Sequence, residues 1–210
     1  MTITEPATLI TDYLLAAFTG VLAWRLFAGS RERRPASRWW WGVAFAATAV
    51  SGAAGGTVHG FRLLLDPRVT TTLWVVTLEG LIVAAFAVIR GTLVSSPLRA
   101  SSIRSATLVA GAAYAVYGLW IVGQPRFVFA IAAYAIAMGV LVGFKLSTWE
   151  RERTAARWMI AGVLVSAVAA VVQQSGFSIH EHFNHNDLYH VIQAVGVWLL
   201  YRGAEASHLR

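Results

Sequence analysis

The chain has 210 residues, of which 57% are hydrophobic and only 13% are charged, and its formal net charge at pH 7 is +7. Soluble domains carry about a quarter of their residues as charges, so this composition excludes an ordinary soluble domain. The basic residues flank apolar stretches, which indicates contact with a lipid bilayer and its anionic headgroups rather than with nucleic acid. The chain has no cysteine, which excludes disulfides, thiolate metal sites and cysteine nucleophiles.

Seven segments are apolar over the length that a membrane-spanning helix needs, about 20 residues. They lie at 8–28, 39–60, 70–90, 105–122, 127–147, 157–176 and 187–204. Because the connections are short, consecutive helices should be antiparallel neighbours. The sequence therefore predicts an all-α, polytopic membrane protein: a seven-transmembrane helix bundle that forms a single integral membrane domain.

The distribution of arginine and lysine predicts the orientation of the bundle. Most basic residues fall in one set of alternate connections, and the other set holds only Arg62, Arg68 and Arg126. Loops rich in basic residues remain in the cytoplasm. We therefore expect the N-terminus outside, the C-terminus inside, and a multi-pass location in the plasma membrane of a bacterium.

Small residues recur within the second segment and predict close approach between helices. Glycine lets two helix backbones pack closely inside a membrane. The glycines concerned are Gly52, Gly55, Gly56 and Gly60. We interpret them as packing residues.

Five of the six histidines fall on the predicted outer side. One closes the second segment, and the others lie in the sixth connection and at the start of the seventh segment. They are His59, His180, His182, His185 and His190. The orientation was derived from arginines alone, so this convergence is an independent observation.

Two capping boxes compete for the start of the seventh helix. Ser178 with Glu181 would start it near Ile179, whereas Asn184 with Asp187 would start it one to two turns later. The early start makes the sharper prediction, because one helix face then carries His182, Asn186, Tyr189, His190 and Gln193, with His185 at its edge. Such a polar stripe should face the bundle interior rather than lipid.

The histidines can supply a metal site. Imidazole binds zinc, and a catalytic zinc ion commonly has three protein ligands and a water molecule. His59, His190 and either His182 or His185 could provide the three ligands. Asp187 could bind the metal directly or orient one of the imidazoles. Zinc is therefore the candidate cofactor.

Two further polar residues lie within apolar segments at comparable depth. Glu79 stands near the middle of the third segment with no basic residue close in sequence, which makes it a candidate catalytic group. Ser51 lies two turns below His59 and is a weaker candidate, because serine in a membrane helix usually bonds the backbone. We interpret Asp12 as an interface residue, and Gln173 and Gln174 could join the polar pocket.

Together these features resemble the CREST superfamily of membrane hydrolases, which includes alkaline ceramidases and the progestin and adipoQ receptors. In that family, zinc is held by one histidine of the second helix and two of an H-x-x-x-H motif on the seventh. The resemblance implies His59 and His190 as ligands and Glu79 as the acidic residue near the metal. Asn186 stands where the motif has its other histidine, and Gly55 stands where the family has a serine.

Two functions follow as hypotheses. The first is a zinc-dependent hydrolase that acts on a lipid amide or ester at the outer leaflet, with Glu79 or Asp187 taking a proton from the metal-bound water. The second is a binding or transport protein for protons, metal ions or a small solute, using the outer histidines and Glu79. A haem protein with His59 and His190 as axial ligands is a third hypothesis.

Overall fold

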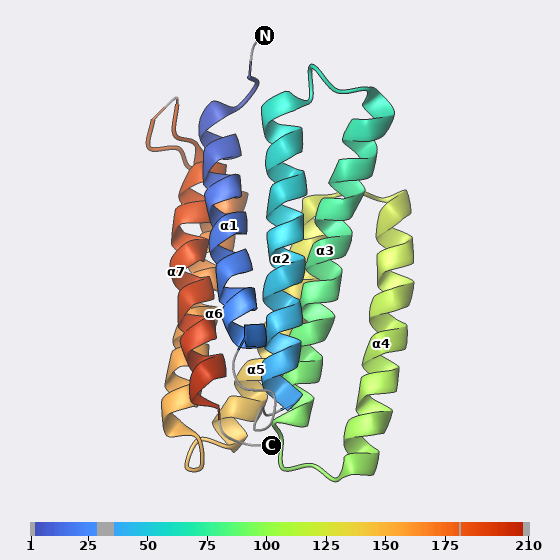
Figure 1. Cartoon of the computed structure of the whole chain (residues 1–210), viewed down its shortest axis with the longest axis vertical. Coiled ribbons are helices and arrows are strands. Elements are labelled where there is room, and N and C mark those ends of the chain that lie inside the picture. Colours follow the sequence, from blue (N-terminus) through green and yellow to red (C-terminus); the bar gives the residue numbers. More distant parts are fainter. Residues whose placement is uncertain (1–2, 29–35, 181, 208–210) are drawn as a thin grey trace.

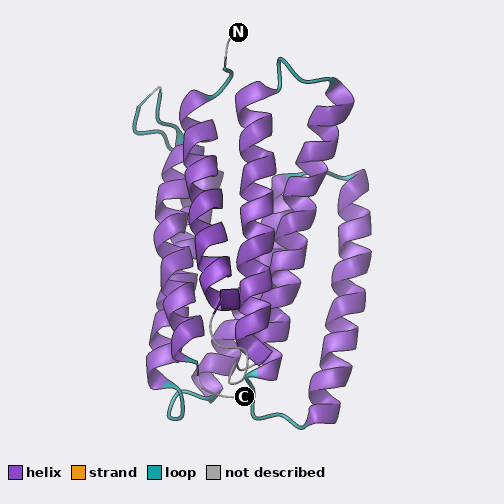
Figure 2. Ribbon diagram, in the orientation of Figure 1, coloured by secondary structure: helices purple, strands orange, loops and turns teal. Residues whose placement is uncertain are grey.

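A computed structural model describes residues 3–28, 36–180 and 182–207, and in these ranges the chain forms seven α-helices. Consecutive helices run in opposite directions, and no strand is drawn among them (Figures 1 and 2). They are α1 (Pro6–Ala28), α2 (Ala36–Phe61), α3 (Pro67–Val94), α4 (Ala100–Gly123), α5 (Phe127–Ser147), α6 (Arg153–Ser175) and α7 (His185–Ala206). The all-α prediction is confirmed.

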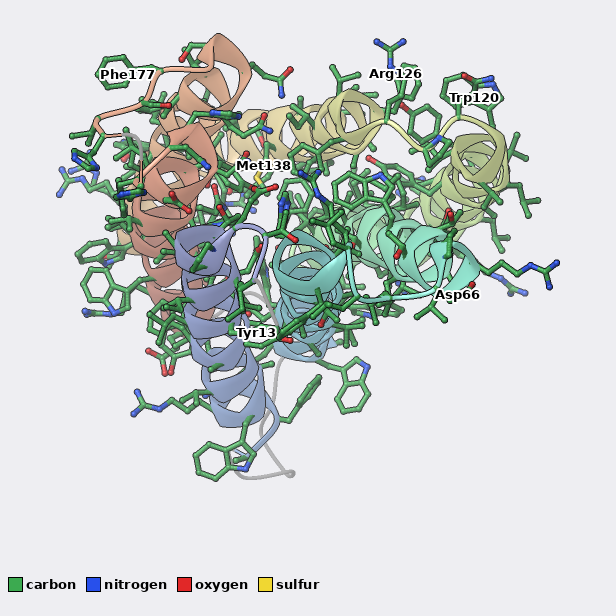
Figure 3. The ribbon with its side chains drawn as sticks, turned by 90° about the horizontal axis from the view of Figure 1, so that it is seen from above. Tyr13, Asp66, Trp120, Arg126, Met138 and Phe177 are labelled. Atoms are coloured by element: carbon green, nitrogen blue, oxygen red, sulfur yellow. The ribbon has the colours of Figure 1, made fainter. Side chains whose placement is uncertain are left out.

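Six of the helices form a ring. Along this ring α1 packs on α2, α2 on α3, α3 on α5, α5 on α6, α6 on α7, and α7 on α1. The remaining helix, α4, packs outside the ring against α3 (Figure 3). The space inside the ring is therefore lined by side chains of these six helices.

Five helices are long and apolar enough to cross a membrane: α1, α3, α4, α5 and α6. The peripheral helix α4 exposes large apolar side chains such as Leu108, Val116 and Leu119, as expected of a surface that faces lipid. This pattern indicates a multi-pass membrane protein. The helices α2 and α7 are of similar length but are not among these five.

The two ends of the bundle differ. The histidine end holds the first turn of α1 and connections 62–66, 124–126 and 176–184, and the arginine end holds connections 95–99 and 148–152 and the last turn of α7 (Figure 1). At the arginine end, Lys145 Nζ donates to Glu152 Oε2 at 2.5 Å, and Ser207 Oγ donates to Glu152 Oε1 at 2.8 Å. All three side chains are buried. This network ties together the ends of α5, α6 and α7.

A capping box fixes the start of α7. The side chain of Asn184 accepts a hydrogen bond from the N–H of Asn186 at 2.8 Å, and Asp187 Oδ2 accepts one from the N–H of Asn184 at 2.7 Å. The later of the two predicted starts is therefore observed, and the start near Ile179 is wrong. His182 consequently lies in the connection before α7 and not on its polar face.

Glycines on α2 permit close packing against α1. A Cβ atom at Gly56 would lie 2.7 Å from Asp12 Cβ and 3.1 Å from the Tyr13 ring, and one at Gly60 would lie 2.8 Å from Leu9. Figure 3 shows Tyr13 beside α2, next to this seam. The packing interpretation of these glycines is confirmed, and the close approach holds Asp12 in position.

Replacing Gly56 with alanine should therefore destabilise the protein. The added methyl group would push against Asp12 and separate α1 from α2, which we expect to cost about 1–3 kcal/mol. The melting temperature in detergent should fall by several degrees. Gly143→Ala is the matched control, because no atom lies within 4 Å of its added Cβ. Equal melting temperatures for the two variants would contradict this account of the α1–α2 seam.

Candidate functional site

The ring encloses a cavity of about 590 Å³ that extends from the histidine end as far as Thr48 on α2, Val142 on α5 and Val163 on α6. All six ring helices line it, from Asp12 on α1 to Gln193 on α7. Seen from the histidine end, Met138 of α5 lies at the middle of the bundle (Figure 3), and this residue lines the cavity. The volume lies within the range that is typical of small-molecule sites, about 300–1,000 Å³.

The other half of the bundle is solid. A cluster of buried apolar side chains fills it, including Leu26, Phe45, Val88, Leu141 and Leu200. These residues come from five of the ring helices. The cavity is thus closed below by the hydrophobic core and, beyond the core, by the Lys145–Glu152–Ser207 network.

One side of the cavity reaches the outer surface of the bundle. Ala135 and Gly139 on α5 and Ala167 on α6 line the cavity and are also exposed. A Cβ atom at Gly139 would meet nothing within 4 Å. The cavity therefore opens sideways between α5 and α6, toward the apolar surface of the bundle.

His190 is held at the cavity wall by two residues of α1. Its Nε2 lies 3.1 Å from Asp12 Oδ1, and its Nδ1 lies 3.0 Å from Thr11 Oγ1. The Thr11 hydroxyl is also 3.0 Å from the carbonyl oxygen of Ala7, one turn earlier. When that hydroxyl donates to the carbonyl, His190 Nδ1–H donates to Thr11. Both ring nitrogens are engaged in either arrangement.

His59 has a similar environment on α2. Its Nδ1 lies 3.1 Å from Glu5 Oε2, and Arg62 lies 3.7 Å from the other oxygen of Glu5. Both of these cavity histidines thus contact a carboxylate of the N-terminal segment or of α1. Glu5 and Asp12 come from the same stretch of chain, so α1 positions both histidines.

The polar stripe predicted for α7 faces the cavity in part. His185, Asn186, Tyr189, His190 and Gln193 line the cavity. Gln193 Nε2 donates to Ser166 Oγ of α6 at 3.2 Å. Gln173 of α6 also lines the cavity. His180 and His182 lie outside it, in the exposed connection, where their rings are 5.3 Å apart.

Aromatic rings surround the upper part of the cavity. The ring centroids of His59 and Trp74 are 6.2 Å apart, those of Trp74 and Phe127 also 6.2 Å, those of Phe127 and Tyr189 6.4 Å, and those of Tyr189 and His190 5.1 Å. All five line the cavity. We call these five residues the aromatic collar; they come from α2, α3, α5 and α7.

The three candidate catalytic residues lie in different places. Ser51 lines the cavity, but its Oγ donates to the backbone carbonyl of Thr77 on α3 at 2.7 Å. Glu79 does not line the cavity; it faces α4, where a Cβ at Gly118 would lie 2.8 Å from its Oε2. Asp187 is 1% exposed and caps α7. The structure therefore does not bring these three side chains together.

The residues that resemble zinc ligands do not fit a zinc site. An imidazole binds a metal through the lone pair of a ring nitrogen, and both ring nitrogens of His190 have protein partners. Within residues 3–28, 36–180 and 182–207, no group of three or more His, Asp or Glu side chains is arranged to hold a metal ion. We therefore derive no step through zinc.

Sequence reasoning missed the role of Asp12. It was expected at the membrane interface, but it is 5% exposed, lines the cavity and contacts His190. The signal was present, because Asp12 stands about one turn inside the apolar segment 8–28 without a basic neighbour. A carboxyl in such a position is expected to face the bundle interior.

Comparison with known proteins gives the family of the chain but no function. The sequence pattern of a family of unknown function, DUF6962, matches residues 7–208. The chain belongs to this family. No curated protein and no solved structure matches the chain. For DUF6962, a functional hypothesis therefore has to be argued from the cavity itself.

We expect the purified protein to contain less than one zinc ion per chain. The reason is that Thr11 and Asp12 already engage the imidazole of His190. Elemental analysis of protein purified without metal-affinity resin would measure this, with the double variant His59→Ala/His190→Ala as the control. One zinc ion per wild-type chain, lost in the double variant, would contradict this interpretation and favour the hydrolase hypothesis.

Proposed function

We propose that this protein binds a small amphipathic molecule within the membrane, in the cavity at the histidine end. The observation that carries the proposal is the uneven distribution of imidazole and amide groups along the cavity wall. Near the histidine end the wall has the polar groups of His59, Asn186 and His190. Toward the middle of the bundle it has apolar side chains such as Leu15 and Met138, beside the hydroxyls of Thr48 and Ser51, which bond backbone carbonyls. A molecule with a polar head and an apolar body matches both parts.

The sideways opening supports a ligand that arrives from the lipid. Ala135, Gly139 and Ala167 are small, so they leave the seam between α5 and α6 open to an apolar chain. An amphipathic molecule already lying in the bilayer could enter there without crossing water.

The shape of the cavity favours binding over conduction of ions. A path for protons or metal ions would have to continue through the bundle to the arginine end. The apolar core around Phe45, Leu141 and Leu200 fills that part of the bundle. The volume of about 590 Å³ is also far larger than an ion requires. The hydrolase hypothesis depends on a metal site that the side chains do not form.

For the topology, we propose that all seven helices cross the membrane, with the histidine end outside. α2 and α7 have 26 and 22 residues, enough to span the hydrocarbon core. Their lower hydropathy is explained by polar residues that line the cavity, such as Ser51, His59 and His190, and that therefore avoid lipid. The excess of basic residues at the arginine end supports a cytoplasmic location for that end, in the plasma membrane of a bacterium.

Binding can be tested with a neutral fluorescent amphiphile, 1-pyrenebutanol, added to the protein in lipid nanodiscs. We expect a saturable component, at one probe per protein, above the linear background of empty nanodiscs. Energy transfer from tryptophan to pyrene reports the bound probe, because Trp74 lines the cavity.

Substitutions at two glycines of α5 distinguish the cavity from the lipid-facing surface. Gly139→Phe should weaken binding at least roughly tenfold, about 1.4 kcal/mol, because the ring would occupy the opening of the cavity. Gly143→Phe is the matched control, one turn further on, exposed and not part of the cavity wall. Neither glycine has an atom within 4 Å of its added Cβ. The absence of a saturable component in the wild-type protein would refute the proposal.

A further inference from the structure

The wall of the cavity has carboxylate and imidazole groups but no basic aliphatic side chain. Among the described residues that line it, Asp12 is accompanied by three histidines, and neither lysine nor arginine is present. The nearest basic group recorded at this end, that of Arg62, contacts Glu5 and does not line the cavity. An anionic head group would therefore find no strong cationic partner.

The aromatic collar supplies a second, independent feature. Aromatic faces carry negative charge density and attract cations within about 6 Å of the ring centre, and rings arranged around a site are a common means of binding quaternary ammonium groups. Trp74, Phe127 and Tyr189, from α3, α5 and α7, line the upper cavity with consecutive centroid distances of 6.2 and 6.4 Å. A cation placed among them would lie near several ring faces at once.

Carboxylates stand behind both histidines of the collar. Glu5 contacts His59 at 3.1 Å, and Asp12 contacts His190 at 3.1 Å. The second oxygen of Asp12, Oδ2, is buried and accepts no hydrogen bond from the described residues. This oxygen can therefore pair with a positively charged group, in a region of low dielectric constant where such an interaction is strengthened.

We propose that the cavity selects amphiphiles with an ammonium head group, which lies within the aromatic collar beside Asp12 while the apolar chain extends toward Met138. This inference rests on the proposed function and adds the chemical class of the ligand. The apolar part of the wall, with Leu15, Leu81 and Val163, matches an alkyl chain.

Three probes with the same fourteen-carbon chain test the selectivity: tetradecyltrimethylammonium, 1-tetradecanol and tetradecanoate. Each would displace 1-pyrenebutanol from the protein in nanodiscs of zwitterionic lipid. Because the three probes partition differently into lipid, each affinity is expressed in terms of the concentration of the probe in the bilayer. We expect the ammonium compound to bind at least roughly tenfold more tightly than the alcohol, and the alcohol more tightly than the carboxylate.

Substitutions then test the residues involved. Trp74→Leu should reduce the preference for the ammonium compound over the alcohol at least roughly threefold, whereas Trp120→Leu, at the outer edge of the bundle (Figure 3), should leave it unchanged. Asp12→Asn should reduce the same preference. Because Asp12 also joins α1 to α7, Trp74→Leu decides the result if Asp12→Asn does not fold.

The possible outcomes separate the inference from the proposed function. Equal or tighter binding of the alcohol or the carboxylate would overturn the inference while supporting a binding cavity. A preference for ammonium that Trp74→Leu leaves unchanged would also overturn it. If 1-pyrenebutanol itself shows no saturable binding, the proposed function fails as well; if it binds saturably and none of the three probes displaces it, the inference alone is overturned.

Discussion

Polar side chains inside a bundle that is surrounded by hydrocarbon must find their partners within the bundle, and this constraint organises the histidine end of the protein. Asp12 and His190 satisfy it by contacting each other across α1 and α7, at 3.1 Å. The contact closes the ring of six helices at the point where the first and last helices meet. It also fixes one histidine of the cavity wall, so closure of the ring and construction of the site depend on the same pair.

The two halves of the bundle follow different packing rules. Toward the arginine end, large apolar side chains pack against one another between the helices. Toward the histidine end, small residues dominate the interior of α2 and α5, and α1 approaches α2 closely enough to meet Gly56. The backbones of α1 and α2 are therefore tightly packed on one side of the cavity, while α5 and α6 leave an opening on the other. This difference is what gives the cavity a single sideways opening.

Much of the fold could be predicted from the sequence, because apolar length and short connections dictate antiparallel helices. The convergence of His59 with the start of α7 also followed from counting helices, since four helices, an even number, separate them. The start of α7 was less certain, because two capping boxes stand six residues apart, and only tertiary packing around Asp187 decides between them. The direction in which Glu79 points was not predictable, because a single carboxyl on an otherwise apolar helix gives no indication of which neighbour it faces.

The resemblance to membrane hydrolases was based on spacing and could not report how each histidine is partnered. Thr11 and Asp12 engage both nitrogens of His190, and nothing in a short motif reveals such contacts. The aromatic collar was equally hidden, since Trp74 and Phe127 lie on different helices and become neighbours only in the closed ring. The chemistry of the site thus depends on tertiary contacts, whereas its location depends on topology.

The central claim is that the cavity is reached from the membrane and ends at the core in the middle of the bundle. Because the chain has no cysteine, single cysteines can be introduced without further changes. Thr48 lines the cavity, whereas Ala44, one turn deeper on α2, is 3% exposed in the core. The uncharged thiol reagent N-ethylmaleimide, which enters lipid, should modify Thr48→Cys but not Ala44→Cys in the folded protein. An unreactive Thr48→Cys, or equal modification of both variants, would contradict the account.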